Sequence, residues 1–163
     1  MIDNKVQSET QWGLIHTDVM AEVDELSFER FGYDDAWSVG GRLVDISRER
    51  NHPVAIAVVF GEQRVFHAAL PGSSANNDDW LDRKFRVVRR HNTASYAIGC
   101  AQRAAGGDYF ADNGYERSKF AVAGGAVPLR VRGSLIGAVG VSGLAEEEDH
   151  ALVVEVLREH RGR

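Results

Sequence analysis

The sequence predicts an α+β domain built on a mostly antiparallel sheet. Apolar runs of strand length occur in pairs separated by short turns, which is typical of antiparallel hairpins. Segments with helical periodicity precede, separate and follow these pairs. The 163 residues have the length of one domain, so we expect residues 1–163 to share a single fold.

The N-terminal region has the spacing of helices. Apolar residues recur at intervals of three and four between Leu14 and Leu26, and we expect Gly32 to end this first helix. A second helix is predicted over residues 36–49, with Asp34 or Asp35 as its N-terminal cap.

Two strands and two further helices follow. Residues 54–60 and 64–70 are apolar runs separated by the turn at 61–63, which predicts a hairpin. Helical spacing then covers about 78–90, and again 95–104 after a break.

The last third of the chain is rich in strands. Residues 106–116 are predicted to form a loop, and 120–123 a short strand. Residues 126–132 and 135–142 are predicted to form a second hairpin. The closing helix starts near Glu146, with acids in its first turn and bases in its last, as the helix dipole favours.

The amino-acid composition disfavours several classes of function. The 19 basic and 24 acidic side chains leave a formal net charge of −5, which disfavours nucleic acid as a partner. No apolar run approaches the roughly 20 residues of a membrane span, and the polar residues 1–11 do not resemble a signal peptide. The single cysteine, Cys100, cannot form an intramolecular disulfide, so we expect a cytoplasmic protein.

The sequence disfavours a phosphate-binding loop, a catalytic cysteine and a metal site. The glycine-rich segment 137–143 lacks the spacing of a phosphate-binding loop, and the acidic helix after it would repel phosphate. Its glycines are better explained by close approach of another segment. Cys100 is expected to be a buried structural residue. The six histidines are scattered, so no metal site is predicted.

The predicted helix 78–90 is the first candidate site. Trp80, Lys84 and His91 lie on one side of it, along the edge of the apolar face. An indole beside cationic groups can hold a small, flat, anionic ligand. The alternative is an amphipathic helix with a solvated basic side that meets the acidic first helix of another subunit. Another side of the helix carries Arg83, Arg86 and Arg90.

Asp149 and His150 form the second candidate. A carboxylate beside an imidazole can fix the tautomer of the imidazole, which suits a general base or an axial metal ligand. Adjacent helical residues point about a quarter-turn apart, however, and Asp149 has an alternative role at the positive end of the helix dipole.

Two stretches resemble the UPF0303 family, which lies within a group of haem-degrading, haem-binding-protein-like domains. Residues 70–84 resemble its loop-and-helix motif, and the similarity extends over about 21–160. The C-terminal signature is matched by residues 123–129, Gly133, 136–137, 141–144, Asp149 and His150.

The resemblance implies a profilin-like fold with a central five-stranded antiparallel sheet, helices on both faces, and assembly into dimers or larger rings. Two positions depart from the pattern: Ala123 stands where a histidine is expected, and Asn76 where an aspartate is expected. The ligand-binding residues that the resemblance implies are Asn77, Trp80, Arg83, Lys84, Gly124, Gly125, Asp149 and His150.

Two hypotheses of function follow. In the first, the protein binds haem or a similar small anionic ligand, with or without oxidative degradation; axial ligation would then come from His150, His91 or Tyr109. In the second, it is a non-catalytic homo-oligomeric module, with Trp80 and its neighbours Arg83 and Lys84 as interface anchors. A metal-dependent hydrolase or lyase that uses Asp149 and His150 has less support, because a second ligand pair is missing.

Overall fold

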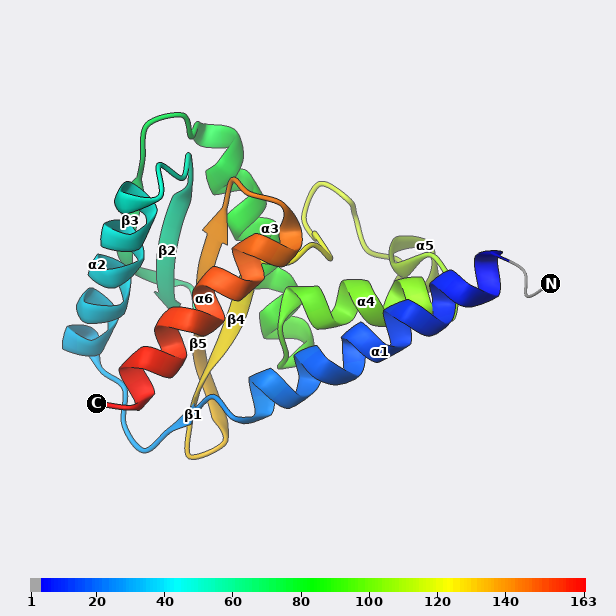
Figure 1. The fold of residues 1–163 in the computed structure, drawn as a ribbon, viewed down its shortest axis with the longest axis horizontal. Coiled ribbons are helices and arrows are strands. Elements are labelled where there is room, and N and C mark those ends of the chain that lie inside the picture. Colours follow the sequence, from blue (N-terminus) through cyan, green and yellow to red (C-terminus); the bar gives the residue numbers. More distant parts are fainter. Residues whose placement is uncertain (1–3) are drawn as a thin grey trace.

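Five strands form one sheet in the order β1-β4-β5-β2-β3 (Figure 1). The computed structural model describes residues 4–163. Strand β1 runs parallel to β4, and all other neighbours are antiparallel. The strands are β1 (Ser27–Phe28), β2 (Ala55–Phe60), β3 (Gln63–Ala69), β4 (Ala126–Val131) and β5 (Ser134–Ser142).

Helices cover both faces of the sheet (Figure 1). Helices α2 and α6 pack together on one face, and α3 packs on the other against β2, β4 and β5. Helix α1 lies along α4, beside the sheet. The helices are α1 (Asn4–Asp24), α2 (Tyr33–Glu49), α3 (Ala75–His91), α4 (Ser95–Ala105), α5 (Tyr109–Asn113) and α6 (Glu146–Arg161).

The two faces of the sheet differ in side-chain size. In β2, Ile56 and Val58 pack toward α2 and α6, whereas the alternate residues Ala55 and Ala57 pack toward α3. In β5, a Cβ atom on Gly140 would lie 2.8 Å from side-chain atoms of α3. Small residues therefore let α3 lie close to the sheet. This agrees with the prediction that another segment closely approaches the glycines of 137–143.

Helix α1 is held by a small apolar cluster with α4. Val19 and Val23 pack against Ala97 and Cys100, all of them buried. Cys100 is buried, as predicted, and its burial raises the pKa of the thiol to about 11.

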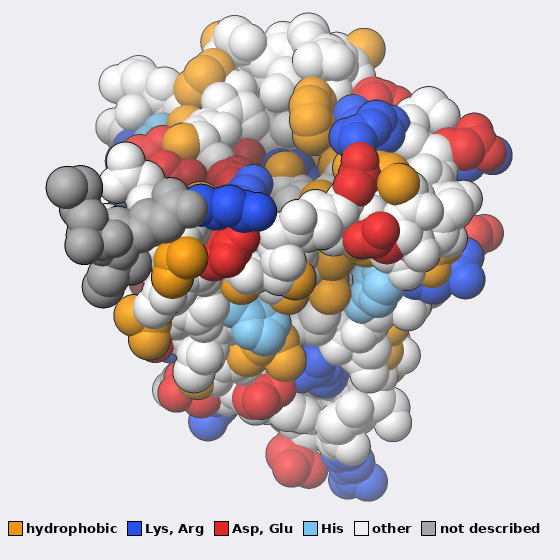
Figure 2. All heavy atoms as spheres, turned by 90° about the vertical axis from the view of Figure 1, so that its right-hand side faces the viewer, with side chains coloured by type: hydrophobic (Ala, Val, Ile, Leu, Met, Phe, Trp, Pro, Cys, Tyr) orange, Lys and Arg blue, Asp and Glu red, His pale blue; other side chains and the backbone are white. Residues whose placement is uncertain are grey.

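The face of the molecule at the N-terminal end of α1 has a mixed surface. Figure 2 shows acidic, basic and hydrophobic side chains interspersed there, without a broad field of either charge sign. None of the helices between residues 4 and 163 combines the length and apolar character that a membrane span needs.

The predicted fold class and strand number are confirmed, but one predicted strand is wrong. Residues 120–123 form no strand; Phe120 is buried because it packs with Val87 and Tyr109 over the outer side of α3. The fifth strand is instead β1, a two-residue segment too short to show a strand pattern.

Several helix boundaries differ from the prediction because capping, which apolar spacing does not report, sets them. Helix α1 ends at Asp24 rather than near Gly32. Helix α2 starts at Tyr33, and the Asp35 carboxylate accepts a hydrogen bond from the Gly32 amide at 2.8 Å. Helix α3 starts three residues early, capped by the Ser74 hydroxyl, and α5 lies in the predicted loop.

Candidate functional site

A buried ion pair joins α3 to α6 at the C-terminal end of β5, the central strand of the sheet. The Lys84 ammonium donates to Asp149 Oδ2 at 3.2 Å and to the Val141 carbonyl of β5 at 3.2 Å. Only 3% of Lys84 and 2% of Asp149 are exposed. Because the partners lie in three elements, this one ammonium ties α3, β5 and α6 together.

Backbone amides complete the environment of Asp149. Its carboxylate accepts hydrogen bonds from the Leu144 amide at 3.0 Å and the Gly143 amide at 3.4 Å. The residue also lies in the first turn of α6, where the helix dipole favours a negative charge. Asp149 therefore fixes the loop that leads from β5 into α6.

Burial opposes the charges of both partners. It raises the pKa of Asp149 to about 6, although Lys84 and the two amides favour the carboxylate. Burial likewise lowers the pKa of Lys84 below its usual value, against the pull of Asp149. The pair is thus an energetically costly arrangement that the surrounding packing maintains.

Two glycines let the segment before β4 pass over the pair. Gly125 has φ +129°, which only glycine adopts without strain, and a Cβ there would lie 2.8 Å from Lys84 Nζ and 3.0 Å from Asp149 Cβ. The Gly124 amide donates to Glu146 Oε2 at 3.2 Å, and Arg103 pairs with the same carboxylate at 2.6 Å. No pattern in the sequence predicted this ion pair between Glu146 and Arg103.

An open pocket lies in front of the ion pair. It has a volume of about 240 Å³ and is formed by the start of α3, the end of β5 and the start of α6. We call it the Lys84 pocket. Its lining includes Asn77, Trp80, Lys84, Ser142, Gly143 and Asp149.

The structure brings most of the predicted site residues together. Asn77 and Trp80 line the Lys84 pocket with the ion pair, and Gly124 and Gly125 lie beside it. Arg83 does not line it. Its guanidinium lies 4.4 Å from the Trp80 ring centroid and 3.7 Å from Asp79.

His150 lies apart from this group. Its Nε2 is 3.0 Å from the Glu22 carboxylate, and its ring packs against Tyr96. It lines another pocket, of about 510 Å³, next to α1. Successive positions of α6 differ by about a quarter-turn, so Asp149 and His150 face different sides of the helix. The acidic residues of that second pocket are Asp18, Glu22, Glu147 and Glu155.

The other two candidates for axial ligation also lie outside the Lys84 pocket. His91 Nε2 is 2.8 Å from the Tyr109 hydroxyl, so these two side chains bind each other. Ala123, which stands where the resemblance implies a histidine, does line the Lys84 pocket. Among residues 4–163, no three His, Cys, Asp or Glu side chains are grouped as a metal site requires.

Comparisons with known proteins agree with this architecture. The family model described as "Haem degrading protein HbpS-like" matches residues 31–158. The chain belongs to this HbpS-like family. A UPF0303 protein of Streptomyces avermitilis is 46% identical over 144 residues, covering 88% of each chain, which confirms the predicted resemblance.

Solved structures support the fold of this HbpS-like protein. The crystal structure of Ybr137w superposes with a TM-score of 0.81 at 25% identity, covering 90% of this chain and 87% of that one. The PduOC–haem complex superposes with a TM-score of 0.68 at 18% identity, covering 78% and 93%. At that identity the second similarity concerns the fold alone.

The residues of the Lys84 pocket do not fit an axially ligated haem. Its lining contains no His, Tyr, Cys or Met side chain that could bind iron. His150 could offer a nitrogen from the second pocket, but the four carboxylates there outnumber its one guanidinium, that of Arg158, and would repel haem propionates. An HbpS-like fold is therefore present here without an evident ligand set for haem.

We predict that Gly125→Ala destabilises the protein by about 3 kcal/mol, because it combines backbone strain with overpacking against Lys84. Gly41→Ala is the matched control, since a Cβ at Gly41 meets no atom within 4 Å and lies in a helix. Urea unfolding of both variants measures the effect. Equal stabilities would contradict the close approach described for Gly125.

We predict that Lys84→Met costs about 3 kcal/mol of stability at about pH 8 and less at about pH 5. Without Lys84, the pKa of the buried Asp149 rises further above its unfolded value of 3.8. The folded variant then takes up a proton that the unfolded chain does not, so its stability increases as the pH falls.

Denaturant unfolding of the wild type and of Lys84→Met at both pH values tests this prediction. Lys119→Met is the control, because Lys119 is exposed and its ion pair with Glu116 lies on the surface. A loss of stability in Lys84→Met that is small, or that grows on acidification, would contradict the buried pair.

Proposed function

We propose that this HbpS-like protein binds a small organic anion in the Lys84 pocket. The observation that carries the proposal is the unused hydrogen-bonding capacity of the Lys84 ammonium. It carries three N–H donors, and within residues 4–163 its contacts with Val141 and Asp149 use two. The third donor is available to a carboxylate oxygen of a ligand in the pocket.

The size and lining of the pocket define the ligand class. A volume of about 240 Å³ lies below the roughly 300–1,000 Å³ of sites for drug-sized ligands. Trp80 offers a flat apolar surface, and Asn77 and Ser142 offer polar groups. Glu146 also lines the pocket, and Arg103 pairs with it. Because Asp149 already offsets the charge of Lys84, we infer a ligand with a single carboxylate rather than a polyanion.

This proposal keeps the small flat anion of the first sequence-based hypothesis but replaces haem by a smaller molecule. No oxidative step is proposed, since the pocket offers no ligand for iron. The alternative role of Lys84 as an interface anchor is not favoured, because the small part of Lys84 that is exposed lines the pocket. Homo-oligomerisation and a cytoplasmic location stay predictions.

We predict that benzoate binds the Lys84 pocket and that benzamide, its uncharged counterpart, binds at least about tenfold more weakly. Trp80 lines the pocket, so its indole N–H resonance should move with benzoate concentration and saturate. Titration followed by NMR, with Trp80→Phe to assign the resonance, gives both affinities. Asn77→Ala should weaken binding, whereas Arg48→Gln, on the opposite layer, should not.

A benzoate titration that leaves the Trp80 resonance unmoved would contradict the proposed function. Equal affinities for benzoate and benzamide would show that the charge of Lys84 does not contribute to binding.

We predict that His150→Ala leaves the absorption spectrum of a mixture with haemin unchanged, because the imidazole is held against Glu22 and Tyr96. Titration of wild type and variant with haemin, followed in the Soret region, measures this. A saturable Soret band in the wild type that His150→Ala abolishes would establish axial ligation and overturn the exclusion of haem.

A further inference from the structure

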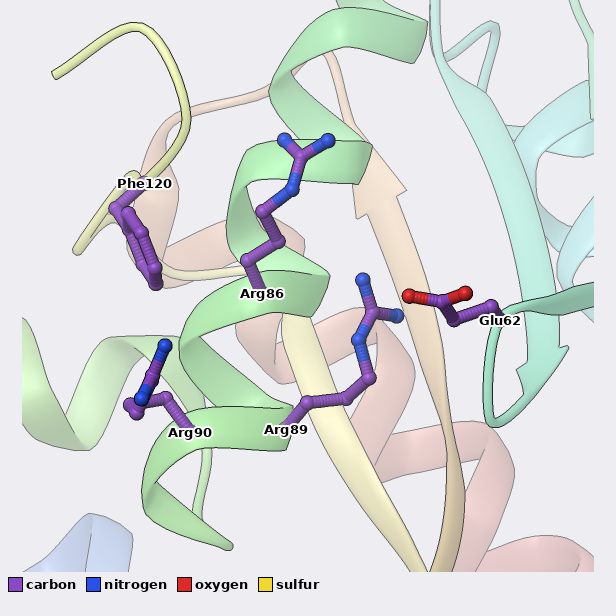
Figure 3. Close-up of a pocket in the computed structure, with 5 residues that line it drawn as sticks. All are labelled: Glu62, Arg86, Arg89, Arg90 and Phe120. Carbon is purple, nitrogen blue, oxygen red and sulfur yellow. The ribbon is translucent and has the colours of Figure 1, made fainter. Parts of the chain in front are cut away.

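The outer side of α3 carries a concentration of positive charge that the Lys84 pocket does not use. Arg86, Arg89 and Arg90 occupy the last turns of the helix and border a hollow of about 460 Å³ (Figure 3). Glu62, from the turn between β2 and β3, and Phe120, from the segment before β4, complete its lining. We call this the arginine pocket. It shares no lining residue with the Lys84 pocket.

Backbone carbonyl groups position two of the guanidinium groups. Arg86 donates to the Lys119 carbonyl at 3.1 Å, and Arg89 donates to the Gly61 carbonyl at 3.3 Å. A guanidinium carries five N–H donors, so each contact leaves several for a ligand. A carbonyl also orients the side chain without neutralising its charge.

Aromatic rings hold the third guanidinium. Arg90 lies 5.3 Å from the Tyr115 ring centroid and 6.0 Å from that of Phe120. These two rings are stacked at 4.5 Å, with an interplanar angle of 16°. Phe120 forms the wall of the pocket on the Arg90 side (Figure 3), and Tyr115, which does not line the pocket, stacks against it.

The charges in the arginine pocket are not balanced. The residues that line it carry three guanidinium groups and one carboxylate, that of Glu62, which leaves two positive charges in excess among them. In Figure 3, Arg89 points toward Glu62, whereas Arg86 and Arg90 extend away from it. Burial lowers the pKa of Arg89, and so does the neighbouring Arg86, whereas Glu62 and Asp82 raise it. A bound anion would relieve the repulsion between the arginines.

We propose that the arginine pocket is a second binding site, for a small molecule that carries a phosphate group. Guanidinium groups match the oxygens of phosphate with paired hydrogen bonds, and two excess positive charges suit its double negative charge. The Phe120 ring would contact the part of the molecule that bears the phosphate. The site is independent of the Lys84 pocket, so either proposal can fail without the other.

The test is an NMR titration of the full chain with inorganic pyrophosphate in phosphate-free buffer at low ionic strength. We expect saturable shifts confined to the amides of residues 60–63, 86–90 and 117–121. Arg89→Gln and Arg86→Gln should each weaken binding by about tenfold or more. Arg86 is exposed and Arg89 is only partly buried, so we expect both variants to keep the fold. Added salt should weaken binding, as for any site that depends on charge.

Two controls separate a site from general attraction. Arg48→Gln, on α2 at the opposite layer, should bind pyrophosphate as the wild type does. Acetate should produce no saturable shift, because it lacks the second charge. Shifts that stay linear up to about 10 mM pyrophosphate, or equal losses in Arg48→Gln and Arg89→Gln, would overturn the proposal. An acetate response equal to that of pyrophosphate would overturn the phosphate specificity.

Discussion

The burial of Lys84 against Asp149 is the contact on which the functional end of this molecule depends. Removing two charges from water is unfavourable unless both are paired and hydrogen-bonded, so the surrounding elements must stay in register. Lys84 satisfies a strand carbonyl, and Asp149 satisfies the amides that lead into α6. Helix α3, strand β5 and helix α6 consequently share one polar centre between two apolar layers.

This centre also explains the local sequence around it. The Gly124–Gly125 segment must pass close to the ammonium, and Gly125 takes a backbone conformation that a side chain would strain. Trp80, one helical turn before Lys84, gives the same pocket an apolar wall. The pocket thus arises from the packing of the pair rather than from a flexible loop.

The sequence predicted the helices and strands better than the contacts between distant segments. Apolar runs and helical spacing located β2, β3, β4, β5 and every described helix except α5, because burial in the core imposes those patterns. Phe120 was assigned to a strand because a side chain that covers a helix has the same apolar character as one in a sheet. The two-residue strand β1 depends on a parallel contact with distant Arg130 and Val131, which no local pattern reports.

The candidate site was predictable only in part, because its contacts also join segments that are distant in the sequence. The family motif grouped Trp80, Lys84 and Asp149, and they meet in one pocket. Helical spacing placed Lys84 at the edge of the core, whereas its partner lies 65 positions away along the chain and makes full burial possible. His150 was grouped with Asp149 by adjacency, although rotation along α6 turns it toward Glu22.

The unequal faces of the sheet constrain how this protein can evolve. On the α3 side, alanine and glycine leave no spare volume, so a larger residue in the sheet requires a compensating smaller one on the helix. On the α2 and α6 side, aliphatic residues of similar size can be exchanged singly at modest cost. Sequence change on the α3 side therefore requires coupled pairs of substitutions. We consequently expect α3, which lines both pockets, to change more slowly in evolution than α2 and α6.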